Sequence, residues 1–470
     1  MKGKLTLLLV AVATSSLAVA ARTFEVTAWR GETVAARLPD FCELGEIPDG
    51  LSVRLGALKT VMYAPPGKTA GLERVFVYDR VSWQPGEDGP RVAEVSVSPN
   101  AKPGVYDCGR MRVTVIDRVL PPPKEWKFYL DLWQHPWAVA RVAKAKPFSK
   151  EHYAAMKPVW ELLATAGAKT ITVPLLDQPW DHQCFDAYHS LVDDPDFKLF
   201  DEYVQFCLDC GLGPDISCYS LCPWTLGLTI DESELEKRWG AFLEKFAAHV
   251  KAKGWFEHTL MSMDERSPED VEKVVRFVRR HAPGMRISMA GNLKLDLLKK
   301  EQIESYSQVL RADAVTPEFL AEAKARTAKG FQTTYYVCVI PGYPNTFMWS
   351  KPDEAYWLGA SPSFLGLDGF LRWAWNSWPQ NPKLDASFED WAPGDTFLCY
   401  PDGEPSWRFL ELRNGIVAAE KMRILKEQGA LNTNDFAKVA ALYDVKRAVE
   451  NKCNFAEIRQ KTQELVNRPK

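Results

Sequence analysis

Residues 260–270 read LMSMDERSPED, an apolar run that stops at two adjacent carboxylates before a helix begins. The apolar part has the length of a buried parallel strand. Ser267 suits the N-cap of the helix and Pro268 its first position, and the two acids that follow favour the helix dipole. Asp264 and Glu265 precede this cap, so helix formation does not account for them. We expect them at a strand end as catalytic candidates, against the alternatives of a solvated loop or a structural salt bridge.

Segments typical of strands and of helices alternate on both sides of this stretch, which predicts a parallel sheet. The helical segments have clear ends, as at 149–166 and at 267–282, where Pro283 and Gly284 follow. The candidate strands are 127–132, 170–173, 214–218, 259–263, 286–289, 312–315, 332–337 and 369–373. Eight strands with helices between them predict a closed, TIM-like (β/α)8 barrel over residues 124–430, and a doubly wound sheet is the alternative.

Polar and aromatic residues follow most of these strands. In a (β/α)8 barrel the carboxyl ends of the strands meet at one face, and the loops there carry the catalytic groups. The residues concerned are Trp133, Asp177, Tyr219, Asp264, Glu265, Asn292, Tyr343, Trp375 and Asn376. Because several such loops share one face, they predict a carbohydrate-binding mouth, in which clustered tryptophans stack on sugar rings.

Short strand-like segments separated by turn residues precede the barrel. They lie at 23–28, 33–38, 51–57, 74–78, 92–97 and 110–116. This pattern predicts a β-sandwich over residues 21–120 with a packing or glycan-binding role, in which Cys42 and Cys108 are the natural disulfide pair. Three prolines at 121–123 form a stiff spacer after it. Beyond the barrel, helices are expected at 409–427, 434–449 and 455–466, with residues 431–470 as a helical extension.

Residues 1–20 have the pattern of a secretory signal peptide, with two lysines, an apolar run at 5–12 and the small residues Ala18 and Ala20 before the cleavage point. We therefore expect an exported protein, periplasmic or secreted. No other stretch has the roughly 18 apolar residues that a membrane span needs. Loss of the two lysines moves the formal net charge from −3 to −5, which argues against nucleic acid as a partner.

Four of the ten cysteines, Cys207, Cys210, Cys218 and Cys222, are spaced in a way that superficially resembles a zinc site. The first two are three residues apart in a helical segment, and the histidines of the chain are scattered. We therefore favour a structural role for these cysteines and predict neither a metal nor a cofactor.

With these residues in view, the barrel resembles glycoside hydrolase family 123, whose type activity is β-N-acetylgalactosaminidase. The resemblance covers about residues 126–426. It is carried by LWQHP at 132–136, the Asp264-Glu265 pair, YYVC at 335–338, LRWAWNSW at 371–378, and the Gly-Asp, Tyr-Pro and Pro-Ser pairs between 394 and 406. Family members similarly place a β-sandwich before the barrel.

The resemblance implies a retaining mechanism assisted by the substrate, in which the 2-acetamido oxygen attacks the anomeric carbon and forms an oxazolinium intermediate. Carried over to this chain, Asp264 orients the acetamide N–H and balances its developing positive charge. Glu265 is then the general acid and afterwards the base for water. A carboxylate beside another in an aromatic mouth is expected to have a raised pKa, and an inward-turned Arg266 would oppose that.

Further side chains are expected to contact the substrate. Tyr336 hydrogen-bonds the acetamide, and a tryptophan walls the sugar. The full set is Tyr336, Trp373, Trp375, Asn376, Trp133 and Asp177. For Trp373 and Tyr335, core packing is the competing explanation.

The sequence thus predicts a retaining exo-β-N-acetylhexosaminidase, of the β-N-acetylgalactosaminidase type, that acts on glycans with a terminal 2-acetamido sugar. Two alternatives stay open. One is a barrel glycosidase with a conventional carboxylate nucleophile, such as Asp177 or Asp313. The other is a glycan-binding surface protein without catalysis. The sequence leaves the oligomeric state open.

Overall fold

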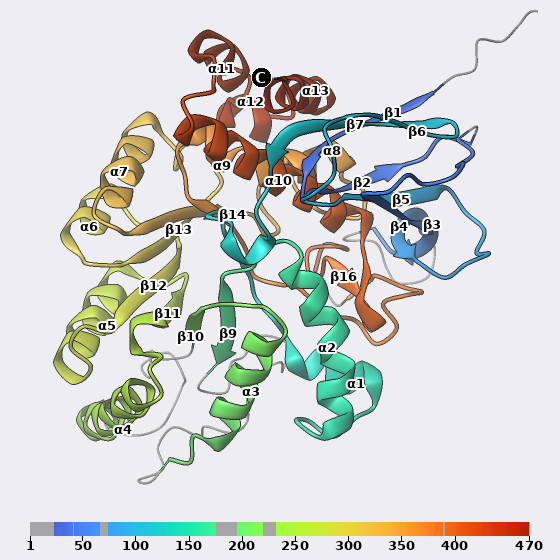
Figure 1. Ribbon diagram of the computed structural model, residues 1–470. Coiled ribbons are helices and arrows are strands. Elements are labelled where there is room, and N and C mark those ends of the chain that lie inside the picture. The colour runs from blue at the N-terminus through green and yellow to red at the C-terminus, as the bar shows by residue number, and fades with distance from the viewer. Residues whose placement is uncertain are drawn as a thin grey trace, which may run out of the picture.

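The computed structural model describes residues 23–40, 42–65, 74–174, 195–219, 232–388 and 391–469. It consists of an N-terminal pair of β-sheets, a barrel of parallel strands surrounded by helices, and a group of C-terminal helices (Figure 1). In Figure 1 the blue sheets and the red C-terminal helices lie next to each other at one side of the barrel. This arrangement confirms the predicted fold class.

The N-terminal region is a sandwich of a three-stranded sheet, in the order β1-β7-β6, and a four-stranded sheet, in the order β2-β5-β3-β4. Apolar residues that alternate along β1, β5 and β7 form its inner core. The strands are β1 Phe24–Arg30, β2 Thr33–Arg37, β3 Leu51–Tyr63, β4 Val75–Ser82, β5 Arg91–Val97, β6 Gly104–Cys108 and β7 Met111–Val119. Sequence analysis missed β6, because most of its residues are exposed and no apolar alternation marks it.

Cys42 and Cys108 are both buried in this inner core, but as free thiols. The predicted disulfide is therefore wrong. Each side chain packs instead as a small apolar group among the valines of the two sheets, a usual role for a buried cysteine.

The barrel contains eight parallel strands, each hydrogen-bonded to the next in chain order from β9 to β15, with β15 returning to β8. They are β8 Tyr129–Leu132, β9 Thr170–Pro174, β10 Asp215–Tyr219, β11 Thr259–Asp264, β12 Arg286–Gly291, β13 Ser305–Val309, β14 Gln332–Tyr336 and β15 Gly369–Arg372. The predicted strand at 312–315 is wrong, because β13 comes earlier. Its buried residues include two serines and a glutamine, so its sequence lacks the apolar signal of a strand.

A buried glutamine side chain completes the junction between β8 and β9, where Leu130 of β8 forms an isolated bridge with Ala168, two residues before β9. The Oε1 atom of Gln134 accepts the backbone N–H of Thr172 at 2.8 Å. Its Nε2 donates to the backbone oxygens of Leu132 and of a residue on β9. The amide group therefore replaces the missing backbone ladder at the seam of the barrel.

Helices lie between successive barrel strands, as the sequence predicted. They are α1 Pro136–Ala143, α2 Lys150–Ala164, α3 Lys198–Asp209, α4 Glu232–Ala252, α5 Pro268–His281, α6 Leu295–Lys300, α7 Pro317–Thr327, α8 Pro352–Ala360 and α9 Pro362–Leu365. Short elements complete this part: η1 Pro123–Glu125, η3 Phe256–His258, η4 Pro401–Gly403, β16 Cys399–Tyr400 and β17 Glu404–Pro405. No helix in the described ranges is both long and apolar enough to cross a membrane.

The C-terminal helices are α10 Trp407–Glu427, α11 Thr433–Ala440, α12 Val445–Val449 and α13 Phe455–Val466. The single helix predicted at 434–449 is therefore two helices. Helix α10 is buried along most of its length between α8 and the sandwich. The side-chain amide of Asn414 on α10 pairs with both backbone groups of Ala35 on β2. The sandwich and the barrel consequently share one continuous core.

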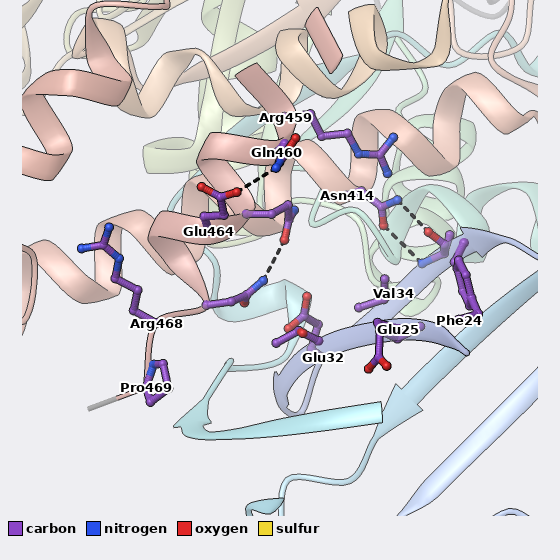
Figure 2. Close-up of a pocket in the computed structure, with 16 residues that line it drawn as sticks. Phe24, Glu25, Glu32, Val34, Asn414, Arg459, Gln460, Glu464, Arg468 and Pro469 are labelled. Carbon is purple, nitrogen blue, oxygen red and sulfur yellow. Dashed lines mark hydrogen bonds between the residues drawn. The ribbon is translucent and has the colours of Figure 1, made fainter. Parts of the chain in front are cut away.

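A pocket of about 570 Å³ lies where α13 meets β1 and β2 (Figure 2). Phe24 and Val34 supply its apolar wall, and Arg459 and Glu464 of α13 face them. None of its lining residues follows a barrel strand. The pocket is therefore distinct from the mouth that the catalytic pair predicts.

Candidate active site

The Asp-Glu pair lies where β11 ends. Asp264 is the last residue of the strand, and the backbone N–H of Glu265 still donates to Ala290 on β12 at 2.8 Å. Glu265 has a φ of +42°, in the left-handed region that residues with a side chain seldom occupy. Ser267 accepts the N–H of Asp270 at 3.1 Å and Pro268 begins α5, so the predicted helix cap is confirmed.

The left-handed backbone at Glu265 interrupts the alternation of side chains along the strand, and both acids reach the same tyrosine. The Oη of Tyr336, the last residue of β14, donates to Oε1 of Glu265 at 2.6 Å. The charge of Asp264 also acts on Tyr336, since it helps to raise the pKa of that phenol. Glu265, just after β11, is thus bonded to the last residue of β14, and the charge of Asp264 acts on the same residue.

Six apolar residues form a layer at the carboxyl ends of the barrel strands, which we name the mouth floor: Trp133, Tyr219, Ala290, Val309, Tyr336 and Leu371. Each stands at or within one residue of the end of a different strand. The rings of Trp133 and Tyr219 are in contact, with centroids 4.4 Å apart. The catalytic candidates therefore lie beside an apolar, aromatic surface at the face where barrel enzymes carry their chemistry.

The surroundings of Asp264 change its pKa. Burial raises the pKa of Asp264 from 3.8 to about 7, and the neighbouring charge of Glu265 adds to that shift. The guanidinium of Arg266 opposes it, as the sequence predicted for an inward-turned arginine, but burial dominates. Glu265 is exposed. The raised pKa expected for a carboxylate beside another in the mouth is therefore found at Asp264.

Tyr336 is a hydrogen-bond donor that the fold keeps protonated. Its side chain is buried, and burial raises its pKa far above the usual value, with the bond to Glu265 adding to the effect. A phenol that holds its proton leaves Glu265 as the acceptor, so the bond fixes one carboxylate oxygen. No group within the described ranges forms such a bond to the second oxygen, which can therefore face a substrate.

Trp373, the first residue after β15, forms a half-buried wall beside the mouth floor. Its indole Nε1 donates to Oδ2 of Asp395 at 2.9 Å. The exposed ring of Trp391 packs on it with centroids 4.7 Å apart, and His135 meets it edge-on. Trp373 packs on the mouth floor, yet it is only half-buried, so with Trp391 it offers a face on which a sugar can stack.

The other predicted contact residues are placed differently. Trp375 has no exposed surface and packs against Phe409 of α10. Both amide atoms of Asn376 are used by the backbone of His135, at 3.0 Å each. Trp133 lies in the mouth floor, almost fully covered. The structure thus gives Trp375 and Asn376 supporting positions behind the mouth.

Tyr335 is fully buried, and its hydroxyl bonds to Ser361 and to a backbone oxygen of α8, which fits core packing. Asp177, predicted both as a contact and as an alternative nucleophile, lies outside the described residues. Asp313, the other alternative nucleophile, is exposed and held by Arg311, whose hydrogen bond lowers the pKa of the Asp313 carboxyl.

Asp395 and Arg372 are residues whose role sequence reasoning missed. Both are fully buried and form an ion pair of 2.9 Å. Asp395 belongs to the Gly-Asp pair of the family resemblance. The signal for its role is Arg372, because an arginine at the end of an apolar strand requires a buried partner. Among the described residues, no group of three or more histidines, cysteines and acids could hold a metal ion. Cys207, Cys210 and Cys218 are buried in the main core, and Cys222 lies outside the described residues.

Comparison with known proteins gives two findings. The family model described as glycoside hydrolase 123, catalytic domain, matches residues 133–425. A solved family 123 glycoside hydrolase from Clostridium perfringens, studied for the hydrolysis of glycolipid glycans, superposes with a TM-score of 0.76. It has 20% sequence identity, over 95% of this chain and 94% of that chain. A Thermobacillus composti GH10 xylanase matches with a TM-score of only 0.35, at 12% identity over 62% of this chain and 97% of that one. No curated protein sequence matches this chain.

Proposed function

The chain belongs to glycoside hydrolase family 123 and is a glycosidase, and from this premise we propose that it is a retaining exo-β-N-acetylhexosaminidase of the β-N-acetylgalactosaminidase type. Its proposed substrates are glycans that carry a terminal 2-acetamido sugar. The observation that supports this proposal best is the position of Asp264 and Glu265. They are adjacent, at one strand end, beside the mouth floor and the wall of Trp373.

Adjacent carboxylates suit a reaction in which the nucleophile comes from the substrate. The two-carboxylate scheme of glycosidases places an acid and a nucleophile or base on opposite sides of the scissile bond, about 5 Å or more apart. Two neighbours on one strand end reach the same side more easily. In the proposed reaction the 2-acetamido oxygen attacks the anomeric carbon and the glycosidic bond breaks, so the protein supplies only an orienting group and an acid.

Asp264 is the orienting group in this proposal. Its carboxylate accepts the acetamide N–H and stabilises the positive charge that spreads over the oxazolinium ring. Burial makes this charge interaction strong, because little water screens it. Burial raises the pKa of Asp264 to about 7. Positive charge that develops beside the carboxyl lowers this pKa and favours the ionised form.

Glu265 is the general acid. Its exposed carboxyl protonates the glycosidic oxygen as the bond breaks, and afterwards takes a proton from the water that opens the oxazolinium ring. The hydroxyl of Tyr336 holds one of its oxygens at 2.6 Å. The bond orients the second oxygen toward the leaving group while the first is fixed.

Hydrolysis of aryl β-N-acetylgalactosaminides and β-N-acetylglucosaminides tests the proposal. We expect release from at least one of them, and no release from either between about pH 4 and 8 would contradict it. An inhibitor that mimics the oxazoline, such as a thiazoline, separates the mechanisms. Tight inhibition is expected for substrate assistance, whereas indifference would favour a conventional carboxylate nucleophile.

The Glu265→Gln variant tests the acid role. We expect it to lose most activity on substrates with poor leaving groups and much less on activated aryl glycosides, because the latter need little protonation. The matched measurement is kcat on both substrate classes in the same preparation. An equal loss on both would contradict the role of general acid.

We also propose that the protein is exported, because residues 1–20 have the pattern of a signal peptide. N-terminal sequencing of protein recovered from outside the cytoplasm of a producing bacterium tests this. A mature chain that begins near Ala21 is expected, and a product that keeps Met1 would contradict the proposal.

A further inference from the structure

The wall of the mouth is held from behind by a buried ion pair. The indole Nε1 of Trp373 donates to Asp395 at 2.9 Å, and the other oxygen of this carboxylate accepts Nη2 of Arg372, also at 2.9 Å. Asp395 and Arg372 have no exposed surface. The position of the Trp373 ring is therefore tied to the position of the loop that carries Asp395.

The residue before Asp395 joins this pair to a second one. The backbone oxygen of Gly394 accepts Nη2 of Arg372 at 3.4 Å and Nη1 of Arg408, on α10, at 3.1 Å. Gly394 has a φ of +88°, and a Cβ added there would lie 2.8 Å from the backbone nitrogen of Met348. Only glycine fits between the two guanidinium groups and the neighbouring loop.

The second ion pair belongs partly to the sandwich. Arg408 donates to both oxygens of Asp79 on β4, from Nε at 2.8 Å and from Nη2 at 2.9 Å. The Oη of Tyr400 donates to the same carboxylate at 2.6 Å. Asp79 is 3% exposed, so this two-pronged bond is shielded from solvent and geometrically strict.

We propose that Asp79, a residue of the β-sandwich, is a positioning residue for the sugar-binding wall of the mouth, acting through Arg408, Gly394 and Asp395 on Trp373. The sandwich then has a defined part in substrate recognition beyond packing. The proposal rests on the proposed location of the active site at the mouth. It follows from an unbroken series of contacts. The carboxylate of Asp79 binds the guanidinium of Arg408, which binds the backbone oxygen of Gly394, and the next residue, Asp395, binds the indole of Trp373.

The Asp79→Asn variant tests this, with Glu32→Gln as its matched control. Glu32 also belongs to the sandwich and also forms a buried ion pair with α10, through Lys421, but that pair has no bond to the Gly394 loop. For Asp79→Asn we expect KM to rise about fivefold or more with kcat within about twofold, because a displaced aromatic wall weakens sugar stacking. For Glu32→Gln we expect an unchanged KM, even where the loss in Tm is the same.

A double-mutant cycle with Trp373→Phe, which removes the indole N–H, decides whether the effect travels through the wall. We expect the Asp79→Asn change to raise KM much less when Trp373 is already phenylalanine. Independent, multiplying effects would overturn the proposal, and so would equal KM changes in Asp79→Asn and Glu32→Gln.

Tyr400→Phe is the variant to use if Asp79→Asn does not fold, since it removes one bond to Asp79 and leaves both charges paired. It should raise KM in the same direction by a smaller factor, and an unchanged KM would overturn the proposal. Any glycoside that the wild type hydrolyses serves as the substrate in these tests. Failure of the 2-acetamido specificity is thus distinguishable from failure of the positioning role.

Discussion

Replacing Asp264 by asparagine should stabilise the protein at neutral and alkaline pH, because it removes a carboxylate whose ionisation the fold opposes. Burial raises the pKa of Asp264 from 3.8 to about 7. A tenfold change in proton affinity corresponds to about 1.4 kcal/mol. The ionised side chain therefore lowers the free energy of unfolding by roughly 4 kcal/mol at most, and a gain of about 1 to 4 kcal/mol is expected for Asp264→Asn above pH 7.

The sign of the pH dependence follows from proton binding. The folded state binds this proton more tightly than the unfolded chain, so the contribution of Asp264 to stability falls as pH rises from 3.8 to about 7. At pH 4 the aspartate is neutral in the folded protein and nearly half neutral in the unfolded chain. The variant should therefore differ little from wild type there.

Urea unfolding of wild type and Asp264→Asn at pH 4 and pH 8 measures this difference. Glu265→Gln is the comparison, because it removes only the neighbouring charge that adds to the raised pKa of Asp264, so at pH 8 it should stabilise the protein less than Asp264→Asn does. Activity should be lost in Asp264→Asn while stability rises, as is common where a site is strained for function. Equal or lower stability of Asp264→Asn at pH 8 would refute the inference that burial opposes ionisation of Asp264.

Three further predictions concern the mouth and the barrel seam. Tyr336→Phe removes the donor to Glu265 and should lower kcat/KM about 10- to 100-fold. The free energy of unfolding should fall by less than about 1 kcal/mol, because water can replace the donor. A loss of stability that exceeds the loss of transition-state stabilisation, both in kcal/mol, would contradict the orienting role. Gln134→Ala should destabilise the barrel by about 2 to 4 kcal/mol and speed hydrogen exchange at the backbone amide of Thr172, because that amide loses its acceptor. An unchanged exchange rate at Thr172 would show that the seam does not depend on the side chain of Gln134. Arg266→Gln removes a positive charge that lowers the pKa of Asp264, so the acidic limb of the plot of kcat/KM against pH should move to higher pH. A move to lower pH would contradict this effect of Arg266 on Asp264.

Much of the fold follows from local patterns in the sequence. The apolar run before Asp264 and the Ser267 cap predicted a strand end and a helix start, and both lie where expected. Seven of the eight barrel strands were predicted close to their positions. The exception is β13, whose buried residues include two serines and a glutamine, so no apolar pattern marks it.

The residues that line the candidate site could be predicted only in part. The tryptophan-rich segment after β15 does not indicate which of its rings faces the mouth and which is buried. Trp373 borders the mouth, whereas Trp375, two residues later, is buried against α10. Asn376 is likewise used up by the backbone of His135. Each of these contacts joins residues far apart in the chain, so neither composition nor spacing could distinguish a sugar-binding ring from a supporting one.

The sequence by itself therefore determined the elements that short-range rules control: the end of β11, the cap of α5, the order of strands and helices, and the adjacency of the two acids. Tertiary structure alone decided the properties that depend on what lies around a residue. Burial by the surrounding barrel raises the pKa of Asp264. The bond from Asp79 to Arg408 links the sandwich to the mouth across more than three hundred residues of sequence. Desolvation and ion pairing arise from packing between distant segments, and no local pattern encodes them.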